Sequence, residues 1–399
     1  MEIRMSSPEL TDADREAVNR VMQTPNLSMG PEIEAFERAF CALTGANHAI
    51  GVNSGTAGLH LCVRAAGVDV SDLVITTPFS FVASTNVILF EKAVPIFVDV
   101  DPLTGNIDPD LLRKAVEDLS LGGEAAQKWL PRRLPAVNEG GLRAVKALLP
   151  VDVFGQPADY DPINAIARQY DLAVIEDSCE ALGGEYKGRT AGTLGDYGVF
   201  AFYPNKQITT GEGGMIITDD QDAADLMRAL RNQGRAPGDT WLEHTYLGYN
   251  YRLDEMSAAL GLSQMDRLET LLQHRAKVAD WYAELLAGIE EVTPPQIVPN
   301  TSRVSWFVYV IRLSASVNRD RVALILEEKG VPVRPYFSPI HLQPYMRDMF
   351  GYQPGDFPVT EDLGNRSLAL PFSGTMTKET VASVCQRIAE AVASAGKTA

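Results

Sequence analysis

Several segments of this chain are apolar along their whole length and alternate with stretches of helical periodicity. The clearest are LAVIE at 172–176, GVFAF at 198–202 and MIIT at 215–218. Apolar residues recur at helical spacing between and around them, as in residues 109–119 and 221–234. A strand without a polar face must be covered on both sides. The alternation therefore predicts an α/β fold whose sheet lies between two layers of helices.

A chain of 399 residues is long enough for about two domains. Residues 1–252 contain N-terminal helices and the apolar strands, and they are predicted to form the larger domain. A long linking helix is expected over 253–286. The segments SWFVYVIRL and ETVASVCQRIAEAVASA beyond it indicate a smaller α+β domain within 253–399. Residues 120–143 show no steady period and are interpreted as a surface insertion.

The charge of the chain argues against two classes of partner. Acidic residues outnumber basic ones by 52 to 35, for a formal net charge of -17, so the surface should repel nucleic acid and anionic membranes. No signal peptide and no membrane-length apolar stretch is found, and the protein is expected to be cytoplasmic. No metal site is predicted, because the cysteines form no CxxC pair; they are Cys41, Cys62, Cys179 and Cys385.

Polar residues interrupt the pattern where strands are predicted to end, the edge at which open α/β sheets bind ligands. The turn NSGTAG at 53–58 leads into a helix, and it either holds an anion on its N–H groups or simply caps that helix. Asp177 follows the strand LAVIE, where it either meets a cation or caps a helix. Phe79 and Phe81 follow another strand and suit either the core or a cofactor platform.

The fourth interruption is Lys206, in the stretch FAFYPNKQITTGEGGMIITDD. A single lysine on a hairpin loop is ordinarily a surface residue. Together, however, the four interruptions supply the groups that hold pyridoxal 5′-phosphate (PLP): a lysine for the aldehyde, an acid for the pyridine nitrogen, an aromatic ring to stack and a turn for the phosphate. Glycines after the lysine allow a sharp reversal and close approach of the backbone.

The sequence resembles the DegT/DnrJ/EryC1/StrS family of sugar aminotransferases from about residue 8 to residue 390. The matching blocks stand in one order and include NSGTAGLHL, FVDVDPLTGNIDP, VFGQPADYDPI, IEDSCEALGGEYKGRTAGTLGDYGVFAFYPNKQITTGEGG, LGYNYRLDEMSAALG and RPYFSPIHLQP. The resemblance implies the fold-type-I architecture, with a mostly parallel seven-stranded sheet in the large domain, and PLP as the cofactor.

The resemblance also implies roles for individual residues. Lys206 would bind the aldehyde, Asp177 would pair with the pyridine nitrogen, and Phe81 would stack on the ring. Glu180 stands where the family usually has a glutamine near the cofactor 3-hydroxyl. His341 matches a residue near the substrate or donor carboxylate.

Two further groups of residues carry expectations from the resemblance. Gly55, Thr56 and Ala57 would lie at the cofactor phosphate. Asn250 matches an asparagine that reaches the phosphate from a neighbouring subunit, and Arg252 is a second candidate for a cross-subunit role at the site. The protein is therefore expected to be a homodimer with shared active sites.

The chain departs from the family pattern at two notable positions. Ala201 stands where many members have a phosphate-binding serine, and Asp152 replaces a common histidine. The expected reaction is transfer of an amino group from L-glutamate to a keto-sugar, which is expected to be nucleotide-linked. Lys206 argues against the dehydrases of the family, which have a histidine there. A keto-inositol or other cyclic ketone as acceptor, and a non-catalytic PLP-binding regulator, remain as alternatives.

Overall fold

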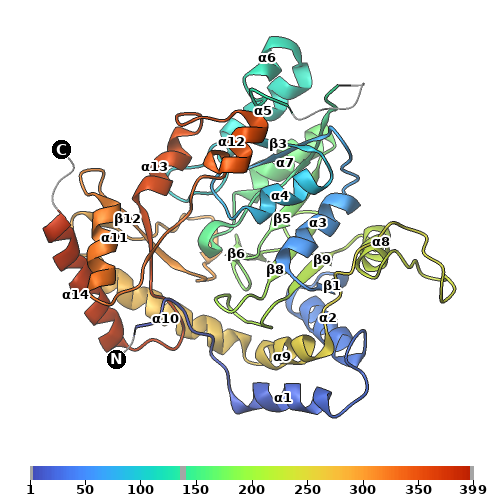
Figure 1. Ribbon diagram of the computed structural model, residues 1–399, viewed down its shortest axis with the longest axis horizontal. Coiled ribbons are helices and arrows are strands. Elements are labelled where there is room, and N and C mark those ends of the chain that lie inside the picture. Colours follow the sequence, from blue (N-terminus) through green and yellow to red (C-terminus); the bar gives the residue numbers. More distant parts are fainter. Residues whose placement is uncertain (1–2, 135–140, 396–399) are drawn as a thin grey trace.

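The structure is a computed structural model that describes residues 3–134 and 141–395. Figure 1 shows a large sheet flanked by helices, and a second, smaller region beside it that holds both ends of the described chain. The predicted domain boundary at residue 252 falls just before a helix that leaves the large sheet, and the division there stays a prediction. Among the described residues, no helix combines the length and the apolar character needed to cross a bilayer.

The large sheet has seven strands. They are β1 (His48–Val52), β2 (Leu73–Thr76), β3 (Val94–Phe97), β4 (Val145–Leu148), β5 (Ala173–Asp177), β8 (Tyr197–Ala201) and β9 (Gly214–Thr218), and their order is β1-β9-β8-β5-β4-β2-β3. β9 is antiparallel to both of its neighbours, and the other adjacent pairs are parallel. The predicted α/β fold with a mostly parallel seven-stranded sheet is confirmed.

Helices cover both faces of this sheet, as the fully apolar strands required (Figure 1). Ile175 and Ile216 pack on one face, and their neighbours Val174 and Ile217 pack on the other. One face is covered by α3 (Gly55–Ala65), α4 (Ala83–Phe90) and α8 (Gln221–Arg231), and the other by α2 (Pro31–Thr44), α5 (Pro109–Leu121) and α7 (Tyr160–Tyr170).

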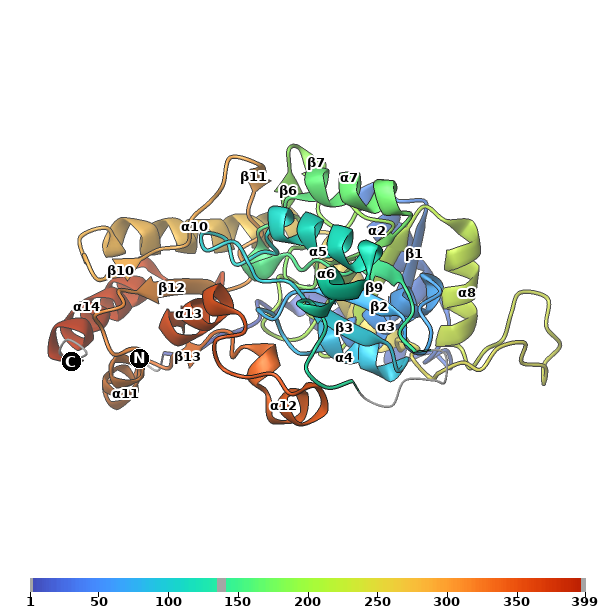
Figure 2. The same cartoon turned by 90° about the horizontal axis from the view of Figure 1, so that it is seen from above.

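The smaller region is built on a four-stranded antiparallel sheet. Its strands, in spatial order, are β10 (Val292–Thr293), β12 (Tyr309–Leu313), β14 (Ser367–Leu370) and β13 (Arg334–Pro335). Helices α10 (Leu268–Leu286), α11 (Arg319–Glu328) and α14 (Lys378–Ala395) share a separate apolar core with it (Figure 2). The other elements are α1 (Asp12–Met22), α6 (Gly123–Gln127), α9 (Glu255–Met265), α12 (Pro344–Phe350), α13 (Pro358–Arg366), the short strands β6 (Glu185–Tyr186), β7 (Arg189–Thr190) and β11 (Thr301–Arg303), and the 3-10 turns at Val153–Gly155 and Ile340–Leu342.

The prediction of one long helix over 253–286 is wrong, because two helices, α9 and α10, occupy this stretch. The break falls at Arg267, whose backbone leaves the helical region with φ −123° and ψ 19°. Its guanidinium bonds to Glu9 Oε1 at 3.2 Å and to Asp14 Oδ2 at 2.9 Å. These partners lie in the N-terminal segment, far away in sequence, so the residues around 267 contain no pattern that predicts the break.

The stretch 120–143, in which the sequence shows no steady period, contains helical structure. α5 continues to Leu121, and α6 follows. The side chain of Asp118 accepts a hydrogen bond from Trp129 Nε1 at 2.9 Å and lies 2.6 Å from Lys128 Nζ, which holds the segment to α5. Residues 135–140 lie outside the described residues, and the interpretation as an insertion stays a prediction.

A buried carboxylate joins the large sheet region to α9. Glu255 is 1% exposed and accepts hydrogen bonds from the backbone N–H groups of Gly30, Glu32 and Ile33, at 2.9, 2.8 and 3.2 Å. The N–H groups of Glu32 and Ile33 lie in the first turn of α2. Gly30 is the residue before the helix and has no side chain with which to cap it. Glu255 therefore caps α2 from a distant part of the chain.

We expect Glu255→Gln to lower the free energy of unfolding by about 1–3 kcal/mol, because a charged acceptor is lost and an amide NH₂ is turned toward N–H donors. Urea unfolding followed by circular dichroism measures the change. Glu269→Gln is the matched control. Glu269 lies on α10, is exposed and pairs with Arg303, and loss of this ion pair should lower the free energy of unfolding by less than about 1 kcal/mol. Equal losses for the two variants would contradict the capping role.

Candidate active site

A cavity of about 420 Å³ opens at the carboxyl ends of the parallel strands, a volume suited to a small molecule. β5 ends at Asp177, and β8 ends at Ala201, five residues before Lys206. All three residues line the cavity, and so do the first residues of α3, beginning with Gly55. The polar interruptions noted in the sequence thus meet in one place.

The start of α3 is packed tightly against the end of β8. A Cβ at Gly55 would lie 2.8 Å from the Cβ of Ala201, so only glycine lets the helix begin so close to the strand. Ser54 Oγ caps the helix and accepts the Ala57 N–H at 3.0 Å. Thr56 lines the cavity, whereas the N–H of Ala57 is already used by the cap. The turn NSGTAG therefore caps a helix, whose positive end lies at the cavity, and the anion site stays a prediction.

Asp177 is 6% exposed and lines the cavity. Its Oδ1 accepts the Cys179 N–H at 3.2 Å, and no helix begins between β5 and β6, so the helix-cap alternative does not apply. Burial raises the pKa of the Asp177 carboxyl, while hydrogen bonds from Cys179 and the charge of Lys206 act in the opposite direction. A cationic group in the cavity would stabilise the ionised form further.

Lys206 is not a surface lysine, since its side chain is only 13% exposed. Its backbone N–H donates to the carbonyl of Tyr203 at 2.9 Å, in the turn that follows β8. The Nζ atom lies 3.7 Å from Glu180 Oε1 and 3.8 Å from the centre of the Phe307 ring. The other oxygen of Glu180 accepts the Phe154 N–H at 2.9 Å. Burial raises the pKa of Glu180, although Lys206 opposes that effect.

The two phenylalanines of the segment after β2 have different surroundings. Phe79 is 1% exposed and packs in the core with Phe154 and Phe337. Of the two alternatives for this residue, core or cofactor platform, the structure shows the core. Phe81 is 65% exposed and lines the cavity. An exposed ring in the lining of a cavity is available to a planar ligand.

Three predicted site residues lie away from this cavity. Asn250 is exposed, and its carbonyl accepts a hydrogen bond from Asn53 Nδ2 at 3.3 Å. Arg252 donates from Nη1 to Asn232 Oδ1 at 3.1 Å. His341 is fully buried, and its Nε2 lies 2.9 Å from Glu361 Oε1. None of the three lines the cavity of its own chain.

Behind Asp177, two fully buried carboxyl groups share one hydroxyl. Ser178 Oγ lies 2.6 Å from Asp152 Oδ2 and 2.9 Å from Glu176 Oε1. A hydroxyl has one hydrogen to donate, so one of the two carboxyl groups must carry a proton of its own. Glu176 also accepts three backbone N–H groups, those of Gly192, Leu194 and Gly195.

Asp152 is the more suitable holder of this proton, because fewer backbone donors surround it. Burial raises the pKa of Asp152, and the charge of Glu176 adds to that effect. Burial likewise raises the pKa of Glu176, although its backbone hydrogen bonds lower it. The pair therefore titrates as a unit and keeps a proton to higher pH than a free carboxyl group.

A family model matches residues 8–389, nearly the whole chain, and its description is the DegT/DnrJ/EryC1/StrS aminotransferase family. The chain belongs to this family. A protein of Caulobacter vibrioides named GDP-perosamine synthase is 36% identical over 380 residues, which are 94% of each chain. A Geobacillus stearothermophilus relative named pleiotropic regulatory protein is 34% identical over 94% of this chain and 92% of its own.

Solved structures agree in fold. Helicobacter pylori PseC, described as an aminotransferase involved in the biosynthesis of pseudoaminic acid, matches with a TM-score of 0.87 and 26% identity. The match covers 99% of this chain and 100% of that one. The family and these relatives make the protein a PLP-dependent aminotransferase.

The residues around the cavity suit PLP. A lysine amine and a buried carboxyl group, Lys206 and Asp177, face one cavity, and the α3 N-terminus supplies N–H donors for an anion. Asn205 also lines the cavity, and its buried Oδ1 has no hydrogen-bond partner among the described residues, which leaves an acceptor for a bound group.

Sequence reasoning missed the part of the cavity wall that comes from the smaller region. Phe307 precedes β12 and Tyr336 follows β13, and both line the cavity. Phe307 has no local signal, because it stands among apolar neighbours typical of any strand. Tyr336 lies in the matching block RPYFSPIHLQP, but the resemblance gave a role there only to His341. Arg275, which holds the backbone of Lys206, was also missed. It had a signal, since it interrupts the apolar stripe of α10.

The shared proton makes stability depend on pH. In the unfolded chain Asp152 ionises near pH 4, whereas the raised pKa keeps it protonated in the folded protein. The folded state then binds more protons between about pH 4 and its own raised pKa. Wild-type stability should fall as the pH rises through the folded pKa, by up to about 1.4 kcal/mol per pH unit.

Asp152→Asn cannot lose that proton and mimics the neutral group. We expect its urea midpoint to fall less than that of the wild type between pH 5 and pH 8. Asp161→Asn is the control, because Lys187 and Arg189 lower the pKa of that exposed carboxyl group and its contribution does not change in this window. Parallel pH dependence of the wild type and Asp152→Asn would contradict the shared proton.

Proposed function

We propose that this aminotransferase moves an amino group from L-glutamate to a nucleotide-linked keto-sugar, in the formation of amino sugars for polysaccharides or glycosides. One observation carries the proposal: the buried amine of Lys206 and the buried carboxyl group of Asp177 share one cavity at the N-terminus of α3. Support for the acceptor comes from the relative named GDP-perosamine synthase, whose name includes a nucleotide sugar.

Each residue has a separate task in this proposal. PLP, when bound, supplies an aldehyde and a ring that withdraws electrons from the donor α-carbon. Asp177 holds a proton on the ring nitrogen by its negative charge, and Phe81 stacks on the ring. Lys206 binds the cofactor and then, as a free amine, carries the proton away from the donor α-carbon. Glu180 lies beside Lys206 and would face the 3-hydroxyl.

The phosphate is proposed to lie at the start of α3, on Gly55 and the side chain of Thr56. The N–H of Ala57 would take part only if Ser54 released it, because Ser54 Oγ accepts it in this structure. The sequence prediction for Ala57 is therefore retained in a narrower form, as a residue that forms the turn.

We propose a homodimer in which Asn250 and Arg252 serve the site of the neighbouring chain. Asn250 is exposed and lies outside the cavity of its own chain, as a cross-subunit contact requires. His341 is fully buried against Glu361, so it would contact a substrate only after a rearrangement of this segment. The cytoplasmic location stays a prediction.

Two alternatives are separated by chemistry. A keto-inositol or another cyclic ketone could replace the sugar, since the lysine and acid are needed for any ketone acceptor. A non-catalytic PLP-binding regulator has support from the relative named pleiotropic regulatory protein. Turnover is favoured because Lys206 and Asp177 together supply the proton transfer and the charge at the ring nitrogen that transamination requires, whereas a regulator needs only to hold the cofactor.

Lys206→Ala should abolish multiple turnover and remove the visible absorption band of the cofactor-loaded protein. In the wild type, L-glutamate should bleach that band, because the cofactor takes up the amino group. Absorption spectra with and without glutamate measure both effects. Lys187→Ala is the control, since that lysine is an exposed partner of Asp161 and should leave the spectrum and its bleaching unchanged. Turnover by Lys206→Ala would overturn the assignment of the lysine.

The acceptor can be found with the loaded enzyme and glutamate. We expect amination of a nucleotide-linked keto-sugar, seen by mass spectrometry as the replacement of the keto oxygen by an amino group. Free keto-inositols should react at least about tenfold more slowly, since they lack the nucleotide contacts that contribute binding energy. Faster reaction with a keto-inositol would replace the proposed acceptor, and bleaching without any acceptor turnover would favour the regulator.

A further inference from the structure

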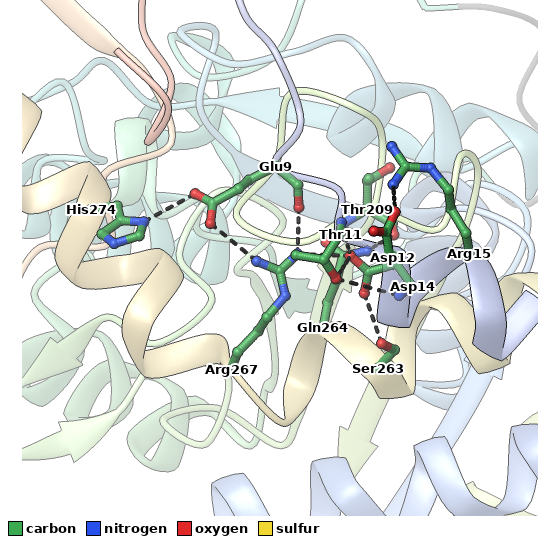
Figure 3. Close-up of polar contacts among 10 residues, drawn as sticks. All are labelled: Glu9, Thr11, Asp12, Asp14, Arg15, Thr209, Ser263, Gln264, Arg267 and His274. Atoms are coloured by element: carbon green, nitrogen blue, oxygen red, sulfur yellow. Dashed lines mark hydrogen bonds and ion pairs between the residues drawn. The ribbon is translucent and has the colours of Figure 1, made fainter. Parts of the chain in front are cut away.

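The loop that bears Lys206 is held from behind by side chains of α9 and α10. Gln264, on α9, makes a two-way contact with Thr209: its Nε2 donates to the Thr209 carbonyl at 2.6 Å, and its Oε1 accepts the Thr209 N–H at 3.1 Å (Figure 3). Gln207 extends the connection, because its Nε2 donates to the Glu180 carbonyl at 2.6 Å and to Ser305 Oγ at 2.7 Å. The backbone on the C-terminal side of the lysine is thus anchored.

Arg275, on α10, anchors the lysine itself. Its Nη2 donates to the carbonyl of Lys206 at 2.7 Å and to that of Asn205 at 3.3 Å. Its Nη1 donates to the carbonyls of Trp306 and Phe307, both at 3.2 Å. One planar guanidinium therefore joins two segments that are about a hundred residues apart. One segment carries Lys206, and the other carries Phe307, whose ring lies beside the Lys206 amine.

The position of this arginine is unusual for a structural residue. It is 4% exposed, and it falls on the buried stripe of α10 between Leu272 and Val278. Burial lowers its pKa to about 10. Among the described residues, Arg275 forms no ion pair. Its hydrogen bonds there all go to backbone carbonyls. An apolar residue at this place would avoid the cost of burying a charge.

The contacts of Arg275 converge on the reacting amine. Phe307, whose carbonyl accepts from one arm of the fork, places its ring centre 3.8 Å from Lys206 Nζ. The other arm holds the backbone from which the Lys206 side chain extends. A shift of the fork would therefore move both the amine and the wall against which it packs.

We infer that Arg275 is a positioning residue that sets the location of the Lys206 amine for attack on the cofactor aldehyde. The inference rests on the proposed role of Lys206 and adds a residue that touches neither substrate nor cofactor. Lysine cannot replace arginine in this role, because a single ammonium group cannot reach four carbonyls in a plane. Misplacement of a reacting group by about 1 Å can cost about a hundredfold in rate.

The test follows formation of the bond between the lysine and the cofactor. The amine nitrogen attaches to the aldehyde carbon of PLP with loss of one water, and borohydride then supplies a hydride that makes the link permanent. Mass spectrometry of the peptide containing Lys206 gives the labelled fraction against time. We expect Arg275→Lys and Arg275→Gln to label at least about tenfold more slowly than the wild type.

Arg267→Lys is the matched control. Arg267 lies at the α9–α10 junction and bonds to Glu9 and Asp14 rather than to the lysine loop (Figure 3). We expect this variant to lose stability in urea but to label Lys206 at the wild-type rate. Equal slowing by Arg267→Lys and Arg275→Lys would overturn the inference, since both would then act through general stability.

A second measurement separates positioning from loss of the cofactor site. In a Lys206→Ala background, PLP affinity measured by quenching of tryptophan fluorescence should change less than about threefold on adding Arg275→Lys, because the α3 N-terminus and Asp177 are untouched. Wild-type labelling rates in Arg275→Lys, or failure of both Arg275 variants to fold, would overturn the inference. Absence of label on Lys206 in the wild type would instead overturn the proposed function.

Discussion

Strands buried on both faces restrict where polar chemistry can occur in this protein. β5, β8 and β9 have apolar side chains on each side, covered by α3 and α8 on one face and by α2 and α7 on the other. A polar side chain within such a strand would lie in one of the two cores, so polar groups collect where the chain leaves the strand. Asp177, Lys206 and the start of α3 meet at this edge for that reason, and all of them line the cavity.

The same edge concentrates ionisable groups that are costly to bury, and each group is compensated differently. Lys206 is compensated by Glu180 and by the face of the Phe307 ring. Asp152 and Glu176 avoid two adjacent charges by sharing a proton across Ser178. Arg275 donates to four backbone carbonyls and lies over the Phe372 ring, 5.8 Å from its centre. The lysine loop is therefore held by hydrogen bonds from α9 and α10, as the role proposed for Lys206 would require.

The sequence predicted which residues would meet at one cavity, and their roles there stay predictions. Lys206, Asp177, Gly55, Thr56 and Phe81 each follow a recognisable strand or begin a helix, and all line the cavity. The predictions for Asn250 and Arg252 came from resemblance alone and concern the site of a neighbouring chain, so they stay predictions. His341, also assigned by resemblance, lies buried against Glu361 and outside the cavity. The failed prediction of a single helix over 253–286 has a related cause: Arg267 leaves the helix to bond to Glu9 and Asp14, and such distant partners have no local pattern.

By itself the sequence determined the class of fold and the chemical groups of the site, because strand burial and strand ends are local properties that apolar patterning records. Only the tertiary structure decided what surrounds the amine. Phe307 and Tyr336 reach the cavity, and Arg275 reaches the lysine loop, because α10 and the smaller sheet fold back against the large one. Contacts between segments a hundred residues apart depend on how two cores pack together. The pattern of apolar residues along the sequence does not record how the cores pack, so it cannot predict these contacts.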